Sequence, residues 1–244
     1  MRRILLSWNG INIYSYPAML YVGLVAGMFA GAHVAQDLGM NPDRYVAATL
    51  ILIIPALVGA RLLFVLAHWD VYACEPRRIW GRGEGGMAMY GGLLLGVPLS
   101  IPLLRALDLP FAAFWDASTF TILIGMVFTR IGCLLNGCCS GRPTDAWFGL
   151  NLPDHCGVWR RRVPTQFIEM GFAAMLLAVA LAMLQRAPFA GSIFCVAVAA
   201  YGVARLSLQQ LRGDETMRGN AVIHIVSLLL VAAAAIGLIA TWFW

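Results

Sequence analysis

The chain has 244 residues, of which 61% are hydrophobic and only 12% are charged, about half the charged fraction of an ordinary soluble domain. This composition excludes a soluble globular enzyme, and its continuously apolar runs argue against the alternating pattern of a membrane β-barrel. All of the basic charge behind the formal net charge of +5 is Arg, and Lys is absent. Because the arginines are spread over short loops, we expect no nucleic-acid partner and favour an anionic lipid headgroup. We predict an all-α, polytopic membrane protein that forms a single domain over residues 1–244.

Apolar segments long enough to cross a hydrocarbon core of about 30 Å recur along the chain. We predict seven spans, near residues 14–34, 45–67, 85–107, 110–137, 163–184, 189–211 and 221–241. The third is rich in glycine and contains Pro98 and Pro102, so we expect a short, broken or re-entrant helix there. A polar loop is expected over residues 138–162. The apolar N-terminal run breaks at residues 7–10, so we expect no cleaved signal peptide.

The loop arginines indicate an orientation. An odd number of spans places the termini on opposite sides, and only Arg44, Arg105 and Arg186 mark the side away from the N-terminus. The positive-inside rule therefore predicts a cytoplasmic N-terminal side.

One face of the fourth span carries a set of polar residues. Arg130, Cys133, Asn136 and Gly137 lie at i, i+3, i+6 and i+7, so they share a helix face. An arginine at membrane depth is costly and is a functional-site hypothesis by default. The guanidinium, thiol and amide could bind a polar headgroup. The alternative is a structural arginine that satisfies carbonyl groups at a helix end.

Other ionisable residues lie within the predicted spans. Tyr201, Arg205 and Gln209 are spaced to stack on one helix face. Glu169, at the start of the fifth span, could pair with any of the arginines, and a structural Arg61–Glu169 salt bridge is the plain alternative. Asp116, in the middle of a span, is expected to pack against a buried arginine rather than to catalyse.

The cysteines raise the question of a metal. Cys133, Cys138, Cys139 and Cys156 accompany His155, but their spacing does not match the paired knuckles of structural zinc sites. Adjacent cysteines do not easily both reach one ion in those geometries, so we expect no metal ligands. A Cys138–Cys156 or Cys74–Cys156 disulfide could form if the loop faces an oxidising compartment.

Several ordered motifs over nearly the whole chain resemble the bacterial prolipoprotein diacylglyceryl transferase family. The family signature, Gly-Arg-x-Gly-Asn-Phe-x-Asn-Gly-Glu-x-x-Gly, is matched at Arg130, Gly132, Asn136, Gly137 and Gly141. The family's Gly-Gly-Met-x-x-His-Gly-Gly segment resembles a stretch that contains Gly85, Gly86, Tyr90, Gly91 and Gly92. Tyr16 and Arg61 fall in the expected places. Two further motifs resemble Pro164-Thr165-Gln166-x-x-Glu169 and Tyr201-Gly202-x-x-Arg205, the latter followed by Arg212 and Asp214.

The resemblance implies a seven-span enzyme of the bacterial inner membrane. Such enzymes transfer the diacylglyceryl group of phosphatidylglycerol to the lipobox cysteine thiol of a lipoprotein precursor, and glycerol phosphate leaves. No cofactor is implied. The family's active-site side and N-terminus face the periplasm, which is opposite to the orientation predicted from the arginine count.

The resemblance also implies roles for the site residues. Arg130 and Arg205 would grip the phosphate, and Arg205 would stabilise both the leaving phosphate and the incoming thiolate. Tyr90 and Tyr201 would position the headgroup, with Asn136 donating to it. The neighbouring glycines would allow close backbone approach. Further substrate-binding positions would be Tyr16, Arg61, Cys133, Gly137, Gly141, Glu169 and Gln209.

The chain departs from the family pattern at five positions of these motifs. The family's histidine is Tyr90 here, its signature asparagine is Cys133 and its signature glutamate is Cys138; a later glutamate is Gln209 and a tyrosine is Ile168. A phenol is a poor general base at neutral pH compared with an imidazole. Two alternatives therefore stay open: a related transferase that uses Cys133 or Cys138 as its own nucleophile, and a non-catalytic module that binds lipid or lipoprotein.

Overall fold

The seven predicted spans are the seven long helices of the structure, a computed structural model that describes residues 3–8, 11–73, 79, 88–153, 157–212 and 217–242. All seven are long and apolar enough to cross a membrane, which confirms the all-α, polytopic class. They are α1 (Ser15–Asp37), α2 (Pro42–Ala67), α4 (Met89–Ala106), α5 (Phe111–Asn136), α6 (Thr165–Leu184), α7 (Ser192–Gln209) and α8 (Met217–Trp242). A single turn, α3 (Trp69–Tyr72), follows α2.

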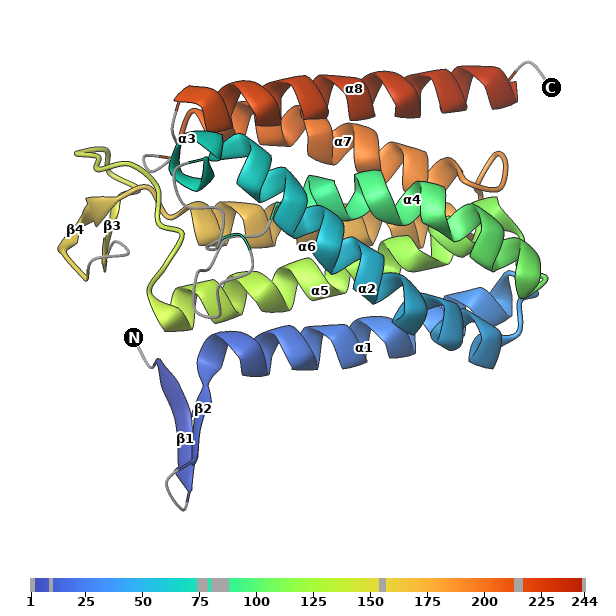
Figure 1. Cartoon of the computed structure of the whole chain (residues 1–244), viewed down its shortest axis with the longest axis horizontal. Helices are drawn as coiled ribbons and strands as arrows, with labels where there is room; N and C mark the ends of the chain where they lie inside the picture. The colour runs from blue at the N-terminus through green and yellow to red at the C-terminus, as the bar shows by residue number, and fades with distance from the viewer. Residues whose placement is uncertain are drawn as a thin grey trace.

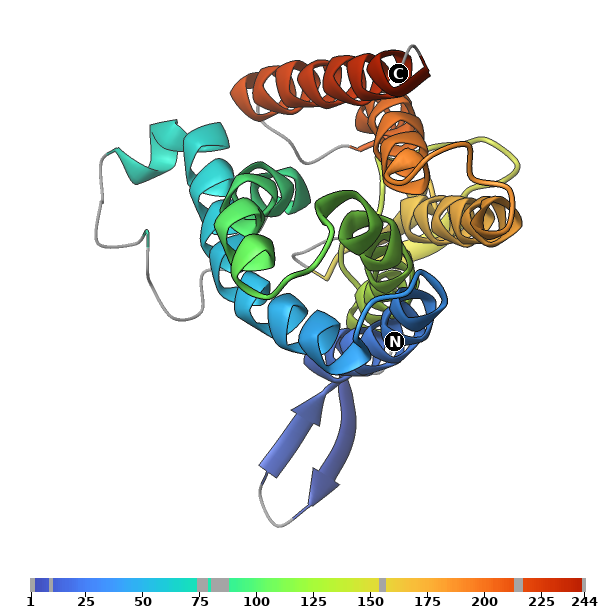
Figure 2. The same cartoon turned by 90° about the vertical axis from the view of Figure 1, so that its right-hand side faces the viewer.

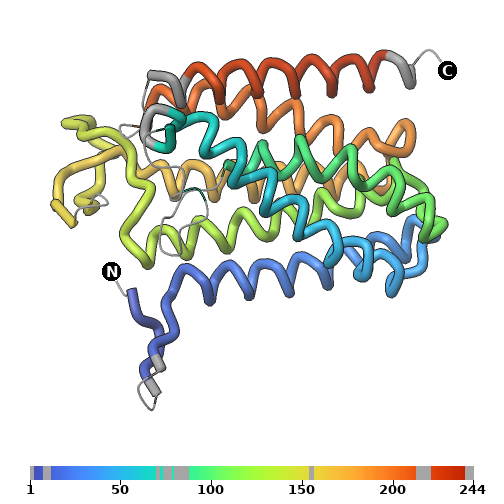
Figure 3. Tube along the Cα trace, in the orientation of Figure 1, coloured from blue at the N-terminus to red at the C-terminus, as the bar shows by residue number. Residues whose placement is uncertain are grey.

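Successive long helices run in opposite directions, so the two termini lie at opposite ends of the bundle (Figure 1). One end, here called the N-terminal end, gathers the N-terminus, α3 and the loop between α5 and α6. The trace in Figure 3 shows the same alternation without the ribbons. Viewed along the bundle, α5 lies centrally, with α1, α2 and α4 on one side and α6, α7 and α8 on the other (Figure 2).

The third long helix differs from expectation in one respect. α4 is short, with 18 residues, but it is continuous through Pro98 and Pro102 and is neither broken nor re-entrant over its described length. It begins at Met89, and residues 80–87 lie outside the described part of the chain. Its Ser100 hydroxyl accepts a hydrogen bond of 3.1 Å from Trp115 Nε1 of α5, so one polar group of the proline-containing segment is satisfied within the protein.

Glycines bring the helices together without intervening side chains. A Cβ atom added to Gly27 of α1 would lie 2.6 Å from the Thr121 carbonyl oxygen of α5. Gly59 of α2 and Gly91 of α4 face each other, and an added Cβ at Gly91 would lie 2.1 Å from the Gly59 oxygen. Such small-residue contacts are how membrane helices gain packing energy where no hydrophobic effect drives them together.

Asp116 has a structural role that differs from the prediction. Its carboxylate accepts hydrogen bonds from the backbone N–H groups of Gly191 (2.6 Å) and Phe194 (2.9 Å). These are donors at the first turn of α7, which have no partner within the helix. The expected packing against an arginine is therefore wrong, and Asp116 instead ties α5 to the start of α7.

Two hairpins at the N-terminal end were not predicted. β1 (Ile4–Trp8) pairs antiparallel with β2 (Ile11–Tyr14), and β3 (Leu150–Pro153) pairs antiparallel with β4 (Trp159–Arg162) inside the expected polar loop. The sequence does carry a signal for the first hairpin. An Asn-Gly pair separates two short segments that contain aliphatic and aromatic residues, which is a common hairpin pattern.

The glycine contact between α2 and α4 predicts a stability difference between two Gly→Ala variants of one helix. Gly91→Ala should lower the free energy of unfolding by about 1–3 kcal/mol, because the new methyl group overlaps the α2 backbone. Gly96→Ala is the matched control, since an added Cβ there meets no atom within 4 Å. Thermal unfolding in detergent micelles measures both, and equal melting temperatures would contradict the packing role of Gly91.

Candidate functional site

The carboxylate of Glu169 is the meeting point of three arginines. Glu169 lies in the first turns of α6 and its side chain is only 1% exposed. Oε2 pairs with Arg130 of α5. Oε1 accepts a hydrogen bond of 2.6 Å from Arg212 Nη2, and Arg205 Nη1 of α7 lies 3.9 Å away. The structure therefore joins Arg130, Arg205 and Glu169, all predicted site residues, and adds Arg212.

Burial makes this cluster a site rather than a surface ion pair. The three guanidinium side chains are between 10% and 19% exposed. Removing charges from water costs several kcal/mol per ion, which an ion pair recovers only with good geometry and further hydrogen bonds. Among the described residues, Glu169 is the carboxylate at which the three guanidiniums meet. The arrangement is therefore suited to an anion that accepts several N–H bonds at once.

Arg61 does not belong to this cluster. Its Nε donates 2.8 Å to the Ile79 carbonyl oxygen, and its guanidinium lies over the rings of Phe64 and Tyr72 at 5.8 and 5.4 Å. The Arg61–Glu169 salt bridge considered as the plain alternative is wrong, because Glu169 pairs with the arginines of α5 and α7. Arg61 instead links the end of α2 to α3 and to residue 79.

The three residues predicted to share one face of α7 are buried. Tyr201, Arg205 and Gln209 are all less than 10% exposed. The Tyr201 ring meets the ring of Tyr90 from α4 edge-on, with centroids 5.8 Å apart. Ser227 of α8 donates a hydrogen bond of 3.0 Å to the Tyr90 hydroxyl oxygen. Helices α4, α7 and α8 therefore place two phenols beside the arginine cluster.

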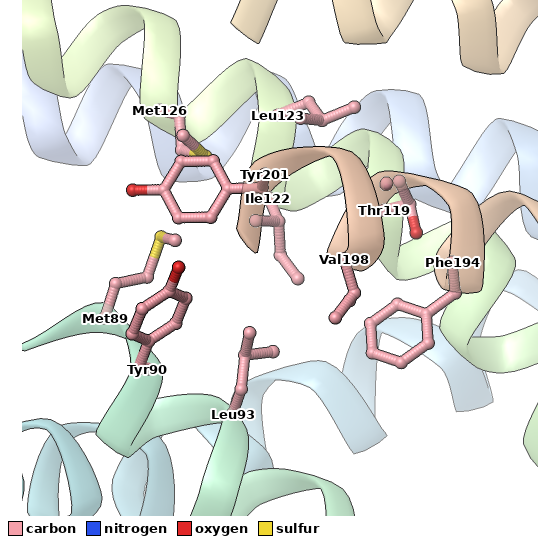
Figure 4. Close-up of a pocket in the computed structure, with 11 residues that line it drawn as sticks. Met89, Tyr90, Leu93, Thr119, Ile122, Leu123, Met126, Phe194, Val198 and Tyr201 are labelled. Atoms are coloured by element: carbon pink, nitrogen blue, oxygen red, sulfur yellow. The ribbon is translucent and has the colours of Figure 1, made fainter. Parts of the chain in front are cut away.

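An apolar cavity of about 40 Å³ extends from these tyrosines between α4, α5 and α7. Figure 4 shows Tyr90 and Tyr201 at one end of it and Phe194 at the other. Most of its lining is aliphatic or aromatic: Met89, Tyr90, Leu93, Thr119, Ile122, Leu123, Met126, Phe194, Ala197, Val198 and Tyr201. The tyrosine end of this apolar space lies one turn of α7 away from Arg205.

The end of α5 turns back on itself at Gly137. Gly137 has a φ of +74°, in the left-handed region that glycine adopts without strain. Its N–H and that of Cys138 bond to carbonyls of the last helical turn, including Cys133 O at 3.0 and 3.1 Å, as in a Schellman cap. Gly137 is therefore required for the turn that follows the Arg130 helix face.

The turn continues through Cys139, which has a φ of +63° although it is not glycine. The segment is fixed by the start of α6: Thr165 Oγ1 donates 2.7 Å to the Cys139 carbonyl, and Gln166 Nε2 donates 2.8 Å to the Cys138 carbonyl. A left-handed non-glycine residue costs free energy and persists only where its surroundings enforce it. The hydrogen bonds from α6 supply that constraint.

The turn brings three thiols together. The sulfur atoms of Cys133, Cys138 and Cys139 all lie within 4.8 Å of one another. The expectation that adjacent cysteines do not converge on one point is wrong here, because the left-handed backbone at Cys139 redirects its side chain. Hydrogen bonding with the Cys133 and Cys139 thiols lowers the pKa of Cys138, and the Arg130 charge adds to that effect.

All three are free thiols, which excludes a Cys138–Cys156 disulfide in this structure. Cys74, His155 and Cys156 lie outside the described residues.

The remaining predicted positions divide between the site and the scaffold. Asn136 borders a second cavity of about 550 Å³ at the N-terminal end, and its backbone carbonyl accepts a hydrogen bond from Arg3. Tyr16 packs against Gly132 and lies within electrostatic range of Arg130 and the thiols. Gly141 has no room for a side chain, since an added Cβ would lie 2.6 Å from the Leu211 oxygen.

The glycines of α4 face the scaffold. Gly91 and Gly92 approach α2 at Gly59 and Ala56, so the close backbone approach they allow is to a helix. Gly85 and Gly86 lie outside the described residues.

Sequence reasoning missed three residues of the site: Arg212, Gln166 and Ser227. Arg212 and Gln166 belong to the recognised motifs, so their motif positions could have marked them. Ser227 lies in an apolar span with no local pattern, and only its hydrogen bond to Tyr90 reveals it.

Loss of the shared carboxylate should cost stability. Glu169→Gln leaves three guanidiniums without their common counter-charge, so the free energy of unfolding should fall by about 3 kcal/mol or more. Asp108→Asn is the matched control at the other end of the bundle. Its exposed pair with Arg44, at 3.6 Å, should contribute less than about 1 kcal/mol. Denaturant unfolding in micelles measures both variants. Equal losses of unfolding free energy would contradict the central role of Glu169.

Comparison with known proteins identifies the family. The family model described as prolipoprotein diacylglyceryl transferase matches residues 3–241. A phosphatidylglycerol–prolipoprotein diacylglyceryl transferase of Halalkalibacterium halodurans is 28% identical over 95% of this chain and 83% of its own length. Proteins of the same description from Nostoc sp. and Bacillus cereus are 26% and 27% identical over 96% and 97% of this chain, and 87% and 91% of their own lengths. The chain therefore belongs to the prolipoprotein diacylglyceryl transferase family.

Proposed function

We propose that this protein transfers the diacylglyceryl group of phosphatidylglycerol to the lipobox cysteine thiol of a lipoprotein precursor. The observation that carries the proposal is the convergence of Arg130, Arg205 and Arg212 on Glu169, beside an apolar cavity. A phospholipid has the matching shape, with an anionic phosphate joined to apolar chains. The names of the relatives support the same reaction.

The arginines would hold the phosphate. A guanidinium presents a planar fork of donors that matches phosphate oxygens, and charge-assisted bonds of this kind are about twice as strong as neutral ones. Arg130 and Arg205 come from two different helices and already face a common point at Glu169. A phosphate bound there would accept charge-assisted bonds from guanidiniums of two helices at once.

The apolar cavity would hold the upper part of an acyl chain. Its tyrosine end lies next to Arg205, because Tyr201 is one turn before that residue on α7. Tyr90 and Tyr201 would then lie between headgroup and chain, where a phenol can contact both through its hydroxyl and its ring. Asn136, near the N-terminal end, would donate a hydrogen bond to the headgroup.

The reaction is a displacement at carbon. The precursor's thiolate sulfur forms a bond to the glyceryl carbon that carries the phosphate oxygen, and that carbon–oxygen bond breaks with its electron pair going to the phosphate. The products are a thioether and glycerol phosphate, whose added negative charge develops in the transition state. Arg205 and Arg130 would stabilise that charge, which is the usual contribution of preorganised cationic donors.

Arg205 should be required for activity. Arg205→Ala should lower kcat/KM for transfer of labelled diacylglyceryl from phosphatidylglycerol to a lipobox peptide by about 100-fold or more. It should also fail to rescue cells depleted of their own transferase. Arg186→Ala, beyond the end of α6 and away from the cluster, is the matched control and should rescue fully. Rescue by both variants would contradict the proposed role.

The same assay separates the alternative functions. Absence of both rescue and peptide labelling by the wild-type chain would favour a lipid- or lipoprotein-binding module. A diacylglyceryl group found on Cys133 or Cys138 by mass spectrometry would favour an internal nucleophile.

The Tyr90 hydroxyl should matter for positioning. Tyr90→Phe keeps the ring contact with Tyr201 but removes one hydrogen-bonding group, which is worth about 0.5–1.5 kcal/mol. We expect transfer to fall by about threefold to tenfold in kcat/KM. Ser227→Ala, which removes only the donor to that hydroxyl, should have a smaller effect in the same assay. A larger loss in Ser227→Ala would contradict this order.

We also propose that the N-terminal end faces the periplasm from the bacterial inner membrane. The arginine excess at this end suggests the opposite orientation by the positive-inside rule, but several of these arginines have local partners. Arg212 pairs with Glu169, Arg3 donates to Asn136 O, and Arg161 donates to the carbonyls of Trp147 and Gly149. Binding roles explain their location without reference to topology.

The orientation has a direct test. With seven spans, a periplasmic N-terminal end requires a cytoplasmic C-terminus. Green fluorescent protein fused after Trp244 should fluoresce, and alkaline phosphatase fused at the same place should be inactive. The reverse pair of results would place the site in the cytoplasm.

A further inference from the structure

The three thiols at the end of α5 form a compact donor set outside the arginine cluster. The Cys133, Cys138 and Cys139 sulfurs lie within 4.8 Å of one another, and the Cys138 and Cys139 sulfurs are 3.7 Å apart. Sulfur ligands at about 2.3 Å from a tetrahedral zinc ion are about 3.8 Å apart. The adjacent pair is therefore already at the spacing of two zinc ligands, and small rotamer changes would bring the third sulfur to the same distance.

The backbone holds this donor set in place. Cys138 and Cys139 are fixed through their carbonyls by Gln166 and Thr165, and Cys139 has a left-handed φ of +63°. Strained backbone of this kind concentrates at binding and active sites. Among the described residues these are the only three His, Cys, Asp or Glu side chains grouped closely enough to hold a metal ion.

The cluster is closed on one side and open on the other. Cys133 is buried, Cys138 is half-buried and Cys139 is exposed. The exposed side lies at the N-terminal end, where Asn136 and Gly137 border the larger cavity. Structural zinc sites fill all four positions with protein ligands, whereas catalytic sites keep three protein ligands and one open position. Three grouped thiols, of which Cys139 is exposed, match the second pattern.

We propose that Cys133, Cys138 and Cys139 bind a zinc ion whose fourth position receives the cysteine thiol of the lipoprotein precursor. The fourth-ligand part of this inference rests on the proposed diacylglyceryl transfer, whereas the metal site stands on the thiol geometry alone. Zinc suits the site because thiolates favour soft or borderline ions, and a three-sulfur set leaves one tetrahedral position vacant for an incoming ligand.

The chemistry balances without a further reactant. On coordination the precursor thiol loses its proton to water, since a zinc-bound thiol is deprotonated outright. The bound sulfur then forms its bond to the glyceryl carbon, the carbon–oxygen bond breaks, and glycerol phosphate leaves with the electron pair. The thioether is a weaker ligand than a thiolate and dissociates. The reaction requires no oxidant or reductant.

The position of the three thiols relative to Arg130 also supports a role in activating the precursor thiol. Cys133 lies three residues after Arg130 on the same helix face, so a sulfur held at the cluster would lie near a phosphate held by the arginines. A zinc ion with three thiolates carries a net negative charge, which the neighbouring guanidinium offsets. The site would also supply an activated thiolate where Tyr90, a poor general base, occupies the place of the family's histidine.

Metal binding is measured on the full-length chain, reduced and freed of metal, in detergent micelles. Zn²⁺ titrated against a chromogenic chelator should bind at one tight equivalent. Cys133→Ser, Cys138→Ser and Cys139→Ser should each weaken binding by at least about 100-fold. Cys195→Ser is the matched control, because Cys195 is a free thiol on α7, and should change the affinity less than twofold.

Thermal unfolding identifies variants that lose zinc binding because they fail to fold. Cys139→Ser should disturb packing least, because Cys139 is exposed. Absence of a tight equivalent in the wild type, or unchanged affinity in folded Cys139→Ser, would overturn the zinc site. Tight binding of Cu⁺ without binding of Zn²⁺ would also overturn it.

The fourth ligand is tested with Co²⁺ in place of zinc. A lipobox peptide with cysteine should increase the sulfur-to-cobalt charge-transfer absorption, and the same peptide with serine should not. An equal response to both peptides would overturn the substrate-ligand role.

Transfer assays separate this inference from the proposed function. Full transfer by chelator-stripped protein would overturn the zinc role and leave the transferase function standing. A cobalt response to the cysteine peptide without diacylglyceryl product would support the thiol site while contradicting the transferase function.

Discussion

The interaction on which the site depends is the sharing of one buried carboxylate by three arginines. Glu169 holds Arg130 of α5, Arg205 of α7 and Arg212 beyond α7 at one point. Each of these cations would be costly to bury alone. Their convergence fixes the relative positions of three helices at the N-terminal end and concentrates positive charge where the apolar cavity begins. The scaffold and the binding site are therefore built from the same ion pairs.

The beginning of α6 connects the arginine cluster with the thiols. Thr165 and Gln166 bond the carbonyls of Cys139 and Cys138, and Glu169 lies one turn further along the same helix. A shift of α6 would therefore move both groups together. The residues of the Pro-Thr-Gln-x-x-Glu motif therefore act together. Its first polar residues shape the loop after α5, and its last residue positions the guanidiniums.

Much of this architecture could be predicted from sequence, because each membrane span is a local property of about 20 consecutive residues. The seven spans follow from hydropathy. The shared face of Tyr201, Arg205 and Gln209, and the place of Arg130 on a polar helix face, follow from helical spacing. Pairing between helices does not. Arg61 and Glu169 are both intramembrane charges, and only the packing of α6 against α5 and α7 decides that Glu169 pairs with Arg130, Arg205 and Arg212. The convergence of Cys138 and Cys139 depended on one left-handed residue that no spacing rule predicts.

The departures from the family pattern form one consistent change. The chain has Tyr90 in place of a histidine, and cysteines at two signature positions, Cys133 and Cys138. Taken singly, each removes a group that could serve acid–base chemistry or orient an arginine. The structure places those two cysteines with Cys139 in one cluster, and Cys133 lies three residues after Arg130 on α5. Beside the proposed phosphate-binding arginines, transfer needs a means of producing a thiolate. A metal held by three sulfurs would provide one without a basic side chain. If the arginine cluster binds phosphate as proposed, loss of the imidazole and gain of the thiols are two parts of one change, in which only the activation of the nucleophile differs.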